Sequence, residues 1–403
     1  MDRAGIREVA KAAGVSISTV SRAFTRPELV SERTRRKVLE TADKLDFNIS
    51  RSATSLKSGQ SYRVAMLMNE EITSWFNTEV FAGIESVMHN AGYDVSLFQH
   101  VDTAENRKEF FTNLPVRRNV DAVFVTSFGV DPKEIQQLKR IHVPIIGINT
   151  PTQNGFDATI SIDDEDGMFT AAQHLINLGH KNIVYVCSDA VDSINSSIDA
   201  RGQGFVRACK TMGASHDFKW RVVSVPRGKT FADSALTALL ALDEFPDAIC
   251  CQMDMMAIPL VLRLERYGHH TPSDYSIIGF DDSPYADTVN LTTMRQDPYA
   301  MGRAAAQKAM KLIEGEPLEN AHEIVRAQLV LRGTDSVYGT GRCEPSLIVL
   351  LQPVNADGLI VMARGGLVGD TPTVVTVCGI RFQEKMKQFA VMCFMTRQSG
   401  ADE

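Results

Sequence analysis

The chain has 403 residues, a formal net charge of -7, 44% hydrophobic residues and 23% charged residues. This balance is typical of globular proteins and excludes a disordered or fibrous chain, and the length allows roughly two to four domains. The N-terminal residues are charged and contain no apolar signal segment, and no run approaches the ~18 apolar residues of a membrane span. We therefore expect a cytoplasmic protein without membrane contact. The seven cysteines are scattered and odd in number, which favours reduced thiols over a disulfide framework.

Charge is distributed unevenly along the chain. Residues 1–60 contain twelve basic and seven acidic side chains, a net charge of +5, which leaves -12 on the remaining 343 residues. A solvated helical face is one interpretation of such a basic segment. The other is a polyanion partner for the N-terminal segment, and the pattern of residues within it favours the polyanion.

Apolar residues at helical spacing predict three short helices in this segment, over residues 6–13, 17–24 and 31–45. Gly14 can end the first helix because it tolerates positive φ, and Ser16 or Ser18 can cap the second. Two short helices across a glycine turn form a helix-turn-helix, whose second helix can enter the major groove of DNA. The third helix is needed to complete a core.

The predicted outward face of the second helix carries side chains that suit DNA bases. Arg22 can bond guanine O6 and N7, Ser18 can bond several base edges, and Ile17 can contact a thymine methyl. The third helix offers cations that suit phosphates, where charge supplies affinity without sequence preference. These cations are Arg33, Arg35, Arg36 and Lys37.

The segments IREVAKAAGVSISTVSRAF (6–24) and VSERTRRKVLETADKLDF (30–47) resemble the DNA-binding head of the LacI/GalR family of bacterial transcriptional regulators, and the resemblance continues to about Val337. It implies base contacts from Ile17, Ser18 and Arg22. It also implies phosphate and capping roles for a set of hydroxyl side chains, namely Ser16, Thr19, Ser21, Ser31 and Thr34. Gly5 departs from the family, which commonly has a threonine cap there, so the first helix should begin less firmly.

Residues 47–61 form a serine-rich segment that, by itself, is a polar linker too short for a stable isolated helix. The family resemblance implies a hinge that folds on DNA, with Leu56 wedged into the minor groove and Ala53 small enough for two such helices to pack. An apolar wedge can unstack a base step and bend the duplex. Ile49 and Thr54 depart from the family pattern, and a passive linker is the alternative.

From residue 62 onward, apolar runs alternate with helical patterns, which is typical of α/β proteins with parallel sheets covered on both faces. The expected helices cover 79–92, 165–179, 202–213 and 232–243. The expected strands cover 62–69, 94–100, 121–127, 143–149, 158–163, 182–188, 221–225, 247–253 and 275–281. These are too many strands for one sheet, so we expect two doubly wound lobes. The family resemblance implies the same two-lobed core as in periplasmic sugar-binding proteins.

The core carries none of the common catalytic or phosphate-binding motifs: there is no GxGxxG, Walker sequence, HExxH, CxxC or GxSxG. His269 and His270 are adjacent, so their side chains diverge, and a surface loop is favoured over a metal site. Cys250 and Cys251 lie in an apolar run and are expected to be buried, inert thiols. We therefore expect no catalytic residues, no cofactor and no metal.

Small molecules bind open α/β sheets at the carboxyl ends of the strands. Residues at such ends, or before the first core helix, with side chains that suit sugar hydroxyls or ring faces are Thr126, Asn149, Asp281, Trp75 and Phe76. A helix cap is the alternative for Asp281, and loop packing is the alternative for Trp75. The family resemblance implies effector contacts from Arg201, Asp281, Asn149, Gln296 and Asp254, with Met253 replacing a family asparagine.

The expected organisation is a helix-turn-helix domain at 1–46, a hinge at 47–61, a two-lobed effector-binding and dimerisation core at 62–337, and an extension without an assigned role at 338–403. The extension is either a small β-rich module or a poorly packed tail. We expect a homodimeric repressor of carbohydrate-utilisation genes that binds operator DNA and responds to a small-molecule effector, which the resemblance implies is a sugar. The alternatives are a sugar-binding protein without a regulatory role and a sugar-metabolising enzyme.

Overall fold

The computed structural model describes most of the chain. The described residues are 5–25, 29–47, 60–69, 71–99, 105, 107, 108, 110, 111, 120–140, 142–189, 196–228 and 230–339, together with the strand backbone of 348–350, 360–368, 371–380 and 391–394. None of the helices in this part of the chain is both long and apolar enough to span a bilayer.

The head consists of the three expected helices: α1 (Ile6–Ala13), α2 (Ile17–Thr25) and α3 (Glu32–Lys44). Gly14 ends α1 in the left-handed conformation, with φ of 64°. The residues that fall at helical spacing in the sequence form a small core of buried side chains, which contains Val9, Ala10, Ala13, Val20, Ala23, Val38 and Ala42. Apolar periodicity thus placed these helices and the sides that face inward correctly.

Helices α1 and α3 of the head both begin at identifiable N-terminal caps. The Gly5 backbone N–H donates to the Glu8 carboxylate at 2.7 Å, so α1 retains half of a capping box although Gly5 has no side chain to contribute. Ser31 Oγ accepts from the Thr34 backbone N–H at 3.4 Å and caps α3.

The chain, with the head included, divides into two compact units, each with its own core sheet. Unit 1 contains residues up to Phe169, with Asp189–Phe205 and Arg295–Gln328, and unit 2 contains Thr170–Ser188, Val206–Met294 and the residues from Leu329 onward. The two sheets have six strands each, so the expected pair of doubly wound lobes is confirmed.

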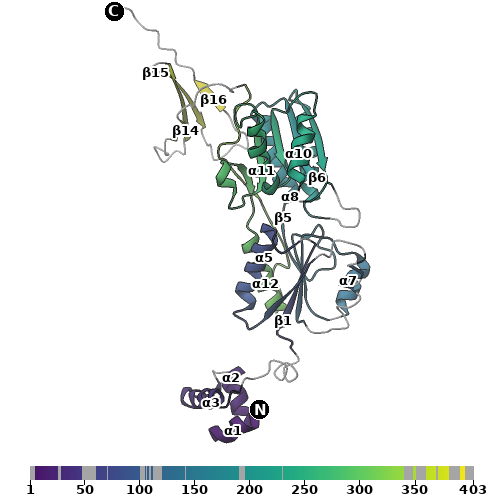
Figure 1. Cartoon of the computed structure of the whole chain (residues 1–403), viewed down its shortest axis with the longest axis vertical. Helices are drawn as coiled ribbons and strands as arrows, with labels where there is room; N and C mark the ends of the chain where they lie inside the picture. The colour runs from purple at the N-terminus through teal and green to yellow at the C-terminus, as the bar shows by residue number, and fades with distance from the viewer. Residues whose placement is uncertain are drawn as a thin grey trace, which may run out of the picture. The chain divides into compact units, whose positions relative to one another are not determined.

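The sheet of unit 1 is entirely parallel, with strand order β11-β5-β4-β3-β1-β2. Its strands are β1 (Arg63–Met68), β2 (Asp94–Phe98), β3 (Ala122–Thr126), β4 (Ile145–Ile148), β5 (Ala158–Ile162) and β11 (His322–Val325). Helices α5 (Trp75–Met88) and α12 (Pro298–Ile313) lie on one side of this sheet, and α7 (Pro132–Lys139) lies on the other (Figure 1). Both sheet faces are thereby covered, which explains the uninterrupted apolar runs of β1 and β3.

Helices α5 and α12 approach each other at glycines. A Cβ on Gly83 would lie 2.2 Å from the Tyr299 carbonyl oxygen, and a Cβ on Gly302 would lie 2.3 Å from the Val80 carbonyl oxygen. The two backbones are therefore closer than any side chain at these positions would permit.

The sheet of unit 2 has strand order β12-β10-β9-β8-β6-β7. Its strands are β6 (Asn182–Ser188), β7 (Lys219–Val225), β8 (Ala248–Cys251), β9 (Ser276–Asp281), β10 (Thr292–Arg295) and β12 (Gln328–Val330). The helices α10 (Phe231–Leu240) and α11 (Asp254–Arg266) contribute to its apolar core. Cys250 and Cys251 are fully buried in β8 and are free, as expected.

Two long helices each pass from one unit to the other along the chain: α8 (Asp164–Asn177) and α9 (Asp199–Met212). The nine strands expected in the core are all present. The strands β10, β11 and β12 were not expected, because they are only three or four residues long and largely polar or exposed.

The extension contains a four-stranded antiparallel sheet of β13 (Ile348–Leu350), β14 (Ile360–Val368), β15 (Thr371–Ile380) and β16 (Val391–Phe394). The described backbone of the extension therefore consists of β-strands.

Candidate functional site

The outward face of α2 carries the side chains expected to read bases. Val20 and Ala23 are buried in the head, whereas Ile17 is 45% exposed and Ser18 and Arg22 are exposed. An apolar side chain, a hydroxyl and a guanidinium therefore stand on one short helical surface. This combination can contact a thymine methyl and the polar edges of bases.

The hydroxyl side chains expected at phosphates and caps belong to local networks. Ser16 Oγ lies 2.7 Å from Ser18 Oγ and 2.8 Å from Thr19 Oγ1, and it accepts from the Thr19 N–H. Ser31 Oγ and Thr34 Oγ1 are 2.8 Å apart at the start of α3. Ser16 and Ser31 therefore act as caps that hold the first turns of α2 and α3 in place.

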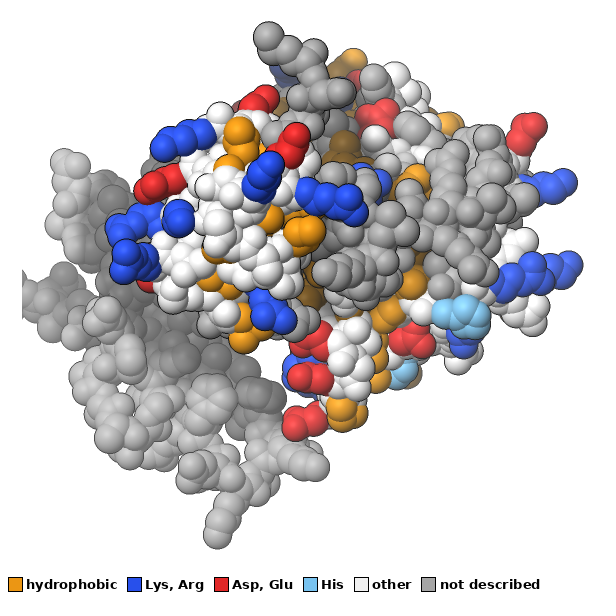
Figure 2. All heavy atoms as spheres, turned by 90° about the horizontal axis from the view of Figure 1, so that it is seen from below, with side chains coloured by type: hydrophobic (Ala, Val, Ile, Leu, Met, Phe, Trp, Pro, Cys, Tyr) orange, Lys and Arg blue, Asp and Glu red, His pale blue; other side chains and the backbone are white. Residues whose placement is uncertain are grey.

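The basic side chains on α3 complete this surface. Arg33, Arg36 and Lys37 are exposed, and Arg35 is half-buried. In the view from below, Lys and Arg side chains form several separate groups on the described surface, with Asp and Glu side chains among them (Figure 2). Ser21 is half-buried on α2, whereas Ala53 and Leu56 lie outside the described residues.

One effector candidate of unit 1, Asn149, lines a pocket of about 550 Å³. It lies where β4 and β5 end and where α8 and α9 begin, which is the carboxyl edge of a parallel sheet. Its lining residues are Asn149, Thr150, Pro151, Thr152, Gln153, Asn154, Ser161, Ile162, Asp163, Asp164, Glu165, Ser196, Ser197, Asp199, Ala200, Gln203 and Ile324.

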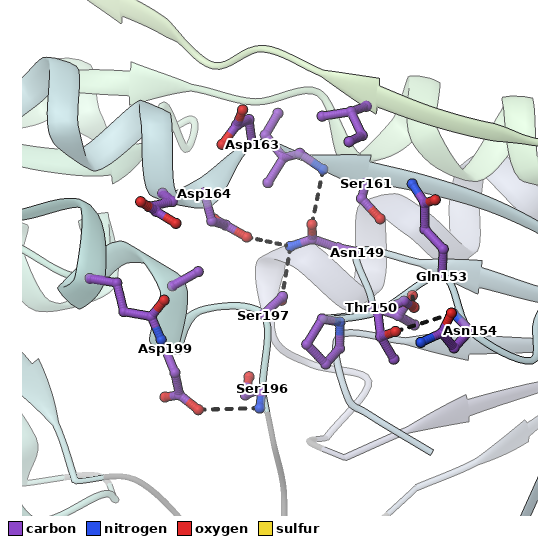
Figure 3. Close-up of a pocket in the computed structure, with 17 residues that line it drawn as sticks. Asn149, Thr150, Gln153, Asn154, Ser161, Asp163, Asp164, Ser196, Ser197 and Asp199 are labelled. Carbon is purple, nitrogen blue, oxygen red and sulfur yellow. Dashed lines mark hydrogen bonds between the residues drawn. The ribbon is translucent and has the colours of Figure 1, made fainter. Parts of the chain in front are cut away.

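Asn149 is at the centre of the hydrogen bonds in this pocket (Figure 3). Its Nδ2 donates to Asp164 Oδ2 and to Ser197 Oγ, both at 3.1 Å, and its Oδ1 accepts from the Ile162 N–H at 3.0 Å. Asn149 itself has a left-handed backbone, with φ of 48°. The amide thus ties together the end of β4, the start of α8 and the turn before α9.

Arg201 joins the same hydrogen-bond network through Asp164. Its Nε donates to Asp164 Oδ1 at 2.7 Å, and both side chains are only 3% exposed. Burial raises the pKa of Asp164, and the adjacent Arg201 guanidinium and the Asn149 amide oppose that shift. The pair holds a carboxylate beside the pocket while keeping its charge compensated.

The remaining candidates of unit 1 lie elsewhere and do not line this pocket. Thr126 is fully buried at the end of β3, and its hydroxyl has no hydrogen-bond partner among the described residues. Trp75 and Phe76 are half-buried in the first turn of α5, which Ser74 caps. Gln296 is 6% exposed just before α12.

In unit 2, Asp281 ends β9 with a φ of 126°, a strained conformation for a residue with a side chain, and it is 9% exposed. Asp254 is fully buried at the start of α11. Its carboxylate accepts from Thr293 Oγ1 at 2.6 Å and from the Ser283 N–H at 2.8 Å. Burial raises the pKa of Asp254 to about 6, against the effect of these two hydrogen bonds. Asp254 therefore fixes the loop that follows Asp281.

Asp164 and Ser197 are missing from the residues expected at the site. A signal for Asp164 was present, because it directly follows an apolar strand and opens a helix, as many ligand-binding residues in α/β sheets do. Ser197 offered no such signal. Among the described residues, no group of three or more His, Cys, Asp or Glu side chains could hold a metal ion.

Comparisons with known proteins find matches for both the head and the core. Residues 5–49 match the family model "Bacterial regulatory proteins, lacI family", and residues 172–334 match the model "Periplasmic binding protein-like domain". A curated relative, the HTH-type transcriptional repressor PurR of Photobacterium profundum, is 29% identical over 336 residues, which cover 82% of this chain and 98% of the relative.

Two solved structures share the fold. The lac repressor dimer bound to operator and the anti-inducer ONPF has a TM-score of 0.70 at 22% identity and covers 83% of this chain and 100% of its own. The complex of transcriptional regulator CelR with cellobiose has a TM-score of 0.58 at 23% identity, with coverages of 82% and 100%. One of these structures is described as a repressor and the other as a transcriptional regulator. With a lacI-type helical head followed by a core like that of periplasmic binding proteins, the chain belongs to the LacI family of DNA-binding transcriptional regulators.

Proposed function

We propose that this protein is a repressor of carbohydrate-utilisation genes that binds operator DNA as a homodimer and is controlled by a sugar effector bound to its core. The observation that carries the proposal is the hydrogen-bonded network of Asn149, Asp164, Ser197 and Arg201 beside the pocket of unit 1. It occurs in the same chain as an exposed recognition helix, so one molecule has both the surface for DNA and the pocket for a signal.

The head supports sequence-specific DNA binding. Arg22 and Ser18 are exposed on α2, and caps at Ser16 and Ser31 hold the first turns of α2 and α3. Two such heads related by two-fold symmetry match the two halves of a near-palindromic operator. We assign the DNA-binding domain to residues 1–46 and the DNA-ordered hinge, with Ala53 and Leu56, to residues 47–61.

The lining of the pocket supports a sugar as the effector. Amides, hydroxyls and carboxylates such as Asn149, Gln153, Ser161 and Asp199 can donate to or accept from several ligand hydroxyls at once. The structurally similar regulator CelR was solved with cellobiose. Because the PurR relative matches over nearly its full length, a purine base is the competing effector class to test.

Control of DNA binding needs no contact between effector and DNA. A sugar that binds one arrangement of the core more tightly than another shifts the population of the dimer that fits its operator. Among the effector candidates, Asn149 lines the pocket of unit 1, and we expect it to contact the effector there. The proposal keeps the other candidates as further effector contacts, although they do not line this pocket: Trp75, Phe76, Thr126, Arg201, Asp254, Asp281 and Gln296.

The test is fluorescence anisotropy of the full chain on DNA fragments from the promoters beside its gene, with and without a panel of free sugars and a purine base. The proposal is supported if the protein binds one DNA fragment specifically and a sugar changes its affinity for that fragment. Sugar binding without fragment-specific DNA binding supports a solute-binding protein instead, and a response to the purine base alone replaces the effector class. An Asn149→Ala variant should keep DNA binding and lose the response.

A further inference from the structure

The described side chains that line the pocket of unit 1 include acidic residues but no basic ones. The acidic residues are Asp163, Asp164, Glu165 and Asp199, and no Lys, Arg or His is among the described lining residues. Asp164 is compensated by Arg201, and Glu165 has a further interaction of its own. Even with these two set aside, Asp163 and Asp199 contribute negative charge at the pocket wall.

Two helices begin at this pocket, and helix N-termini commonly attract phosphate groups. At the start of α8 the chain's own carboxylate occupies that position, because Asp163 Oδ1 accepts from the Asp166 N–H at 2.9 Å. Asp199, the first residue of α9, turns back toward the preceding segment, and its Oδ2 accepts from the Ser196 N–H at 3.2 Å. Figure 3 shows the carboxylate of Asp199 against Ser196. Both donors are neutral, so these bonds leave the carboxylate charges in place.

Arg201 is the guanidinium nearest in sequence to the lining residues of α9, and it is already committed. Its Nε points to Asp164, and its side chain is 3% exposed. A phosphate that recruited Arg201 would leave Asp164 buried without its counter-charge, which is strongly unfavourable. The pocket therefore offers an incoming anion repulsion from its walls and no uncommitted cation among the described lining residues.

We propose that this pocket binds an uncharged, hydroxyl-rich ligand and rejects the phosphate ester of the same ligand. The inference rests on the proposed effector role of the pocket and narrows it to the unphosphorylated form of the signal. The two charges of a phosphate monoester, placed within several ångströms of Asp163 and Asp199, should weaken binding about tenfold or more at physiological salt.

The experiment uses isothermal titration calorimetry and thermal-shift measurements on the full chain with matched pairs: ribose and ribose 5-phosphate, glucose and glucose 6-phosphate, and cellobiose and cellobiose phosphate. For the sugar that binds, the affinity of the free sugar should be at least tenfold higher than that of its phosphate ester. Titrations at 0.05 M and 0.5 M salt should show the gap narrowing as salt rises, because screening weakens the repulsion.

The matched variant is Asp163→Asn with Asp199→Asn, since an asparagine oxygen can still accept from the same N–H groups while the charge is lost. It should narrow the gap between free sugar and ester by about tenfold. The control is Asp131→Asn, which neutralises a carboxylate that caps α7 as Asp163 caps α8 but does not line the pocket. It should leave the gap unchanged.

The outcomes separate the inference from the function on which it rests. An ester that binds as tightly as its parent sugar, or more tightly, overturns the inference and leaves the pocket as an effector site. Binding that persists in Asn149→Ala moves the ligand to another site and overturns both. A panel in which neither sugars nor esters bind also overturns both.

Discussion

The buried pair of Arg201 and Asp164 allows a quantitative test of how unit 1 holds its pocket. Arg201→Met removes the guanidinium and keeps most of the side-chain volume. It leaves Asp164, which is 3% exposed, without the partner that lies 2.7 Å away. Removing one partner of a buried ion pair costs about 3–5 kcal/mol, because the remaining charge stays desolvated. We expect Arg201→Met to lose this much stability.

The loss should depend on pH in a defined direction. Without Arg201, the effect of burial on Asp164 is less opposed, so its pKa in the folded variant should rise further above that in the unfolded chain. The folded variant then binds a proton that the unfolded chain releases, and the penalty should shrink as pH falls. The double variant Asp164→Asn with Arg201→Met should lose about 1–3 kcal/mol less stability than the two single variants lose together.

The assay is thermal unfolding followed by circular dichroism at several pH values. For a unit of about 150–250 residues, a loss of 3–5 kcal/mol lowers Tm by about 6–20 °C. The control is Arg263→Met, which breaks the exposed ion pair with Asp233, in which the two side chains are 30% and 57% exposed. It should cost at most about 1 kcal/mol. Equal losses for Arg201→Met and Arg263→Met would refute the reasoning.

Three further changes test other parts of the structure. Arg22→Ala should cost about 1–3 kcal/mol on the cognate operator and relax base preference, whereas unchanged selectivity on an operator library would remove Arg22 from base reading. Asp254 has a pKa of about 6 in the folded protein against an ordinary 3.8, so its contribution to stability is largest below pH 3.8 and is lost as pH rises to about 6. If Asp254→Asn leaves the dependence of stability on pH unchanged between these values, the pKa shift is contradicted. Gly83→Ala should cost about 1–3 kcal/mol in chemical unfolding, because its Cβ would meet the Tyr299 carbonyl at 2.2 Å, and a neutral effect would show that α5 and α12 can separate freely.

Local periodicity made much of the fold predictable. The three helices of the head follow from apolar residues repeated at helical spacing, and the long core strands follow from apolar runs between helices. The strands β10, β11 and β12 were unpredictable by the same means, because three or four residues carry too little pattern. Their place depends on neighbouring strands that are distant in sequence.

The pocket was predictable only in part, for a related reason. Asn149 stands at the end of an apolar strand, where the topology of α/β sheets places ligand-binding residues. Its partners are set by tertiary structure: Ser197 is 48 residues further along the chain, and the pair of Asp164 and Arg201 spans 37 residues. Asp254 follows a strand as Asn149 does, yet its carboxylate turns inward to Thr293 and Ser283.

The central claim is that one chain couples recognition of an operator to a ligand in its core. The most direct test is the operator dissociation constant of the full chain at ~0.15 M salt, a physiological ionic strength, measured with and without the free sugar that binds the pocket. The account predicts that the sugar changes this constant by about 5- to 150-fold, the usual range of allosteric coupling. It also predicts that Asn149→Ala abolishes the change. Operator affinity that stays the same with saturating sugar, or binding that does not distinguish the operator from bulk DNA, would contradict it.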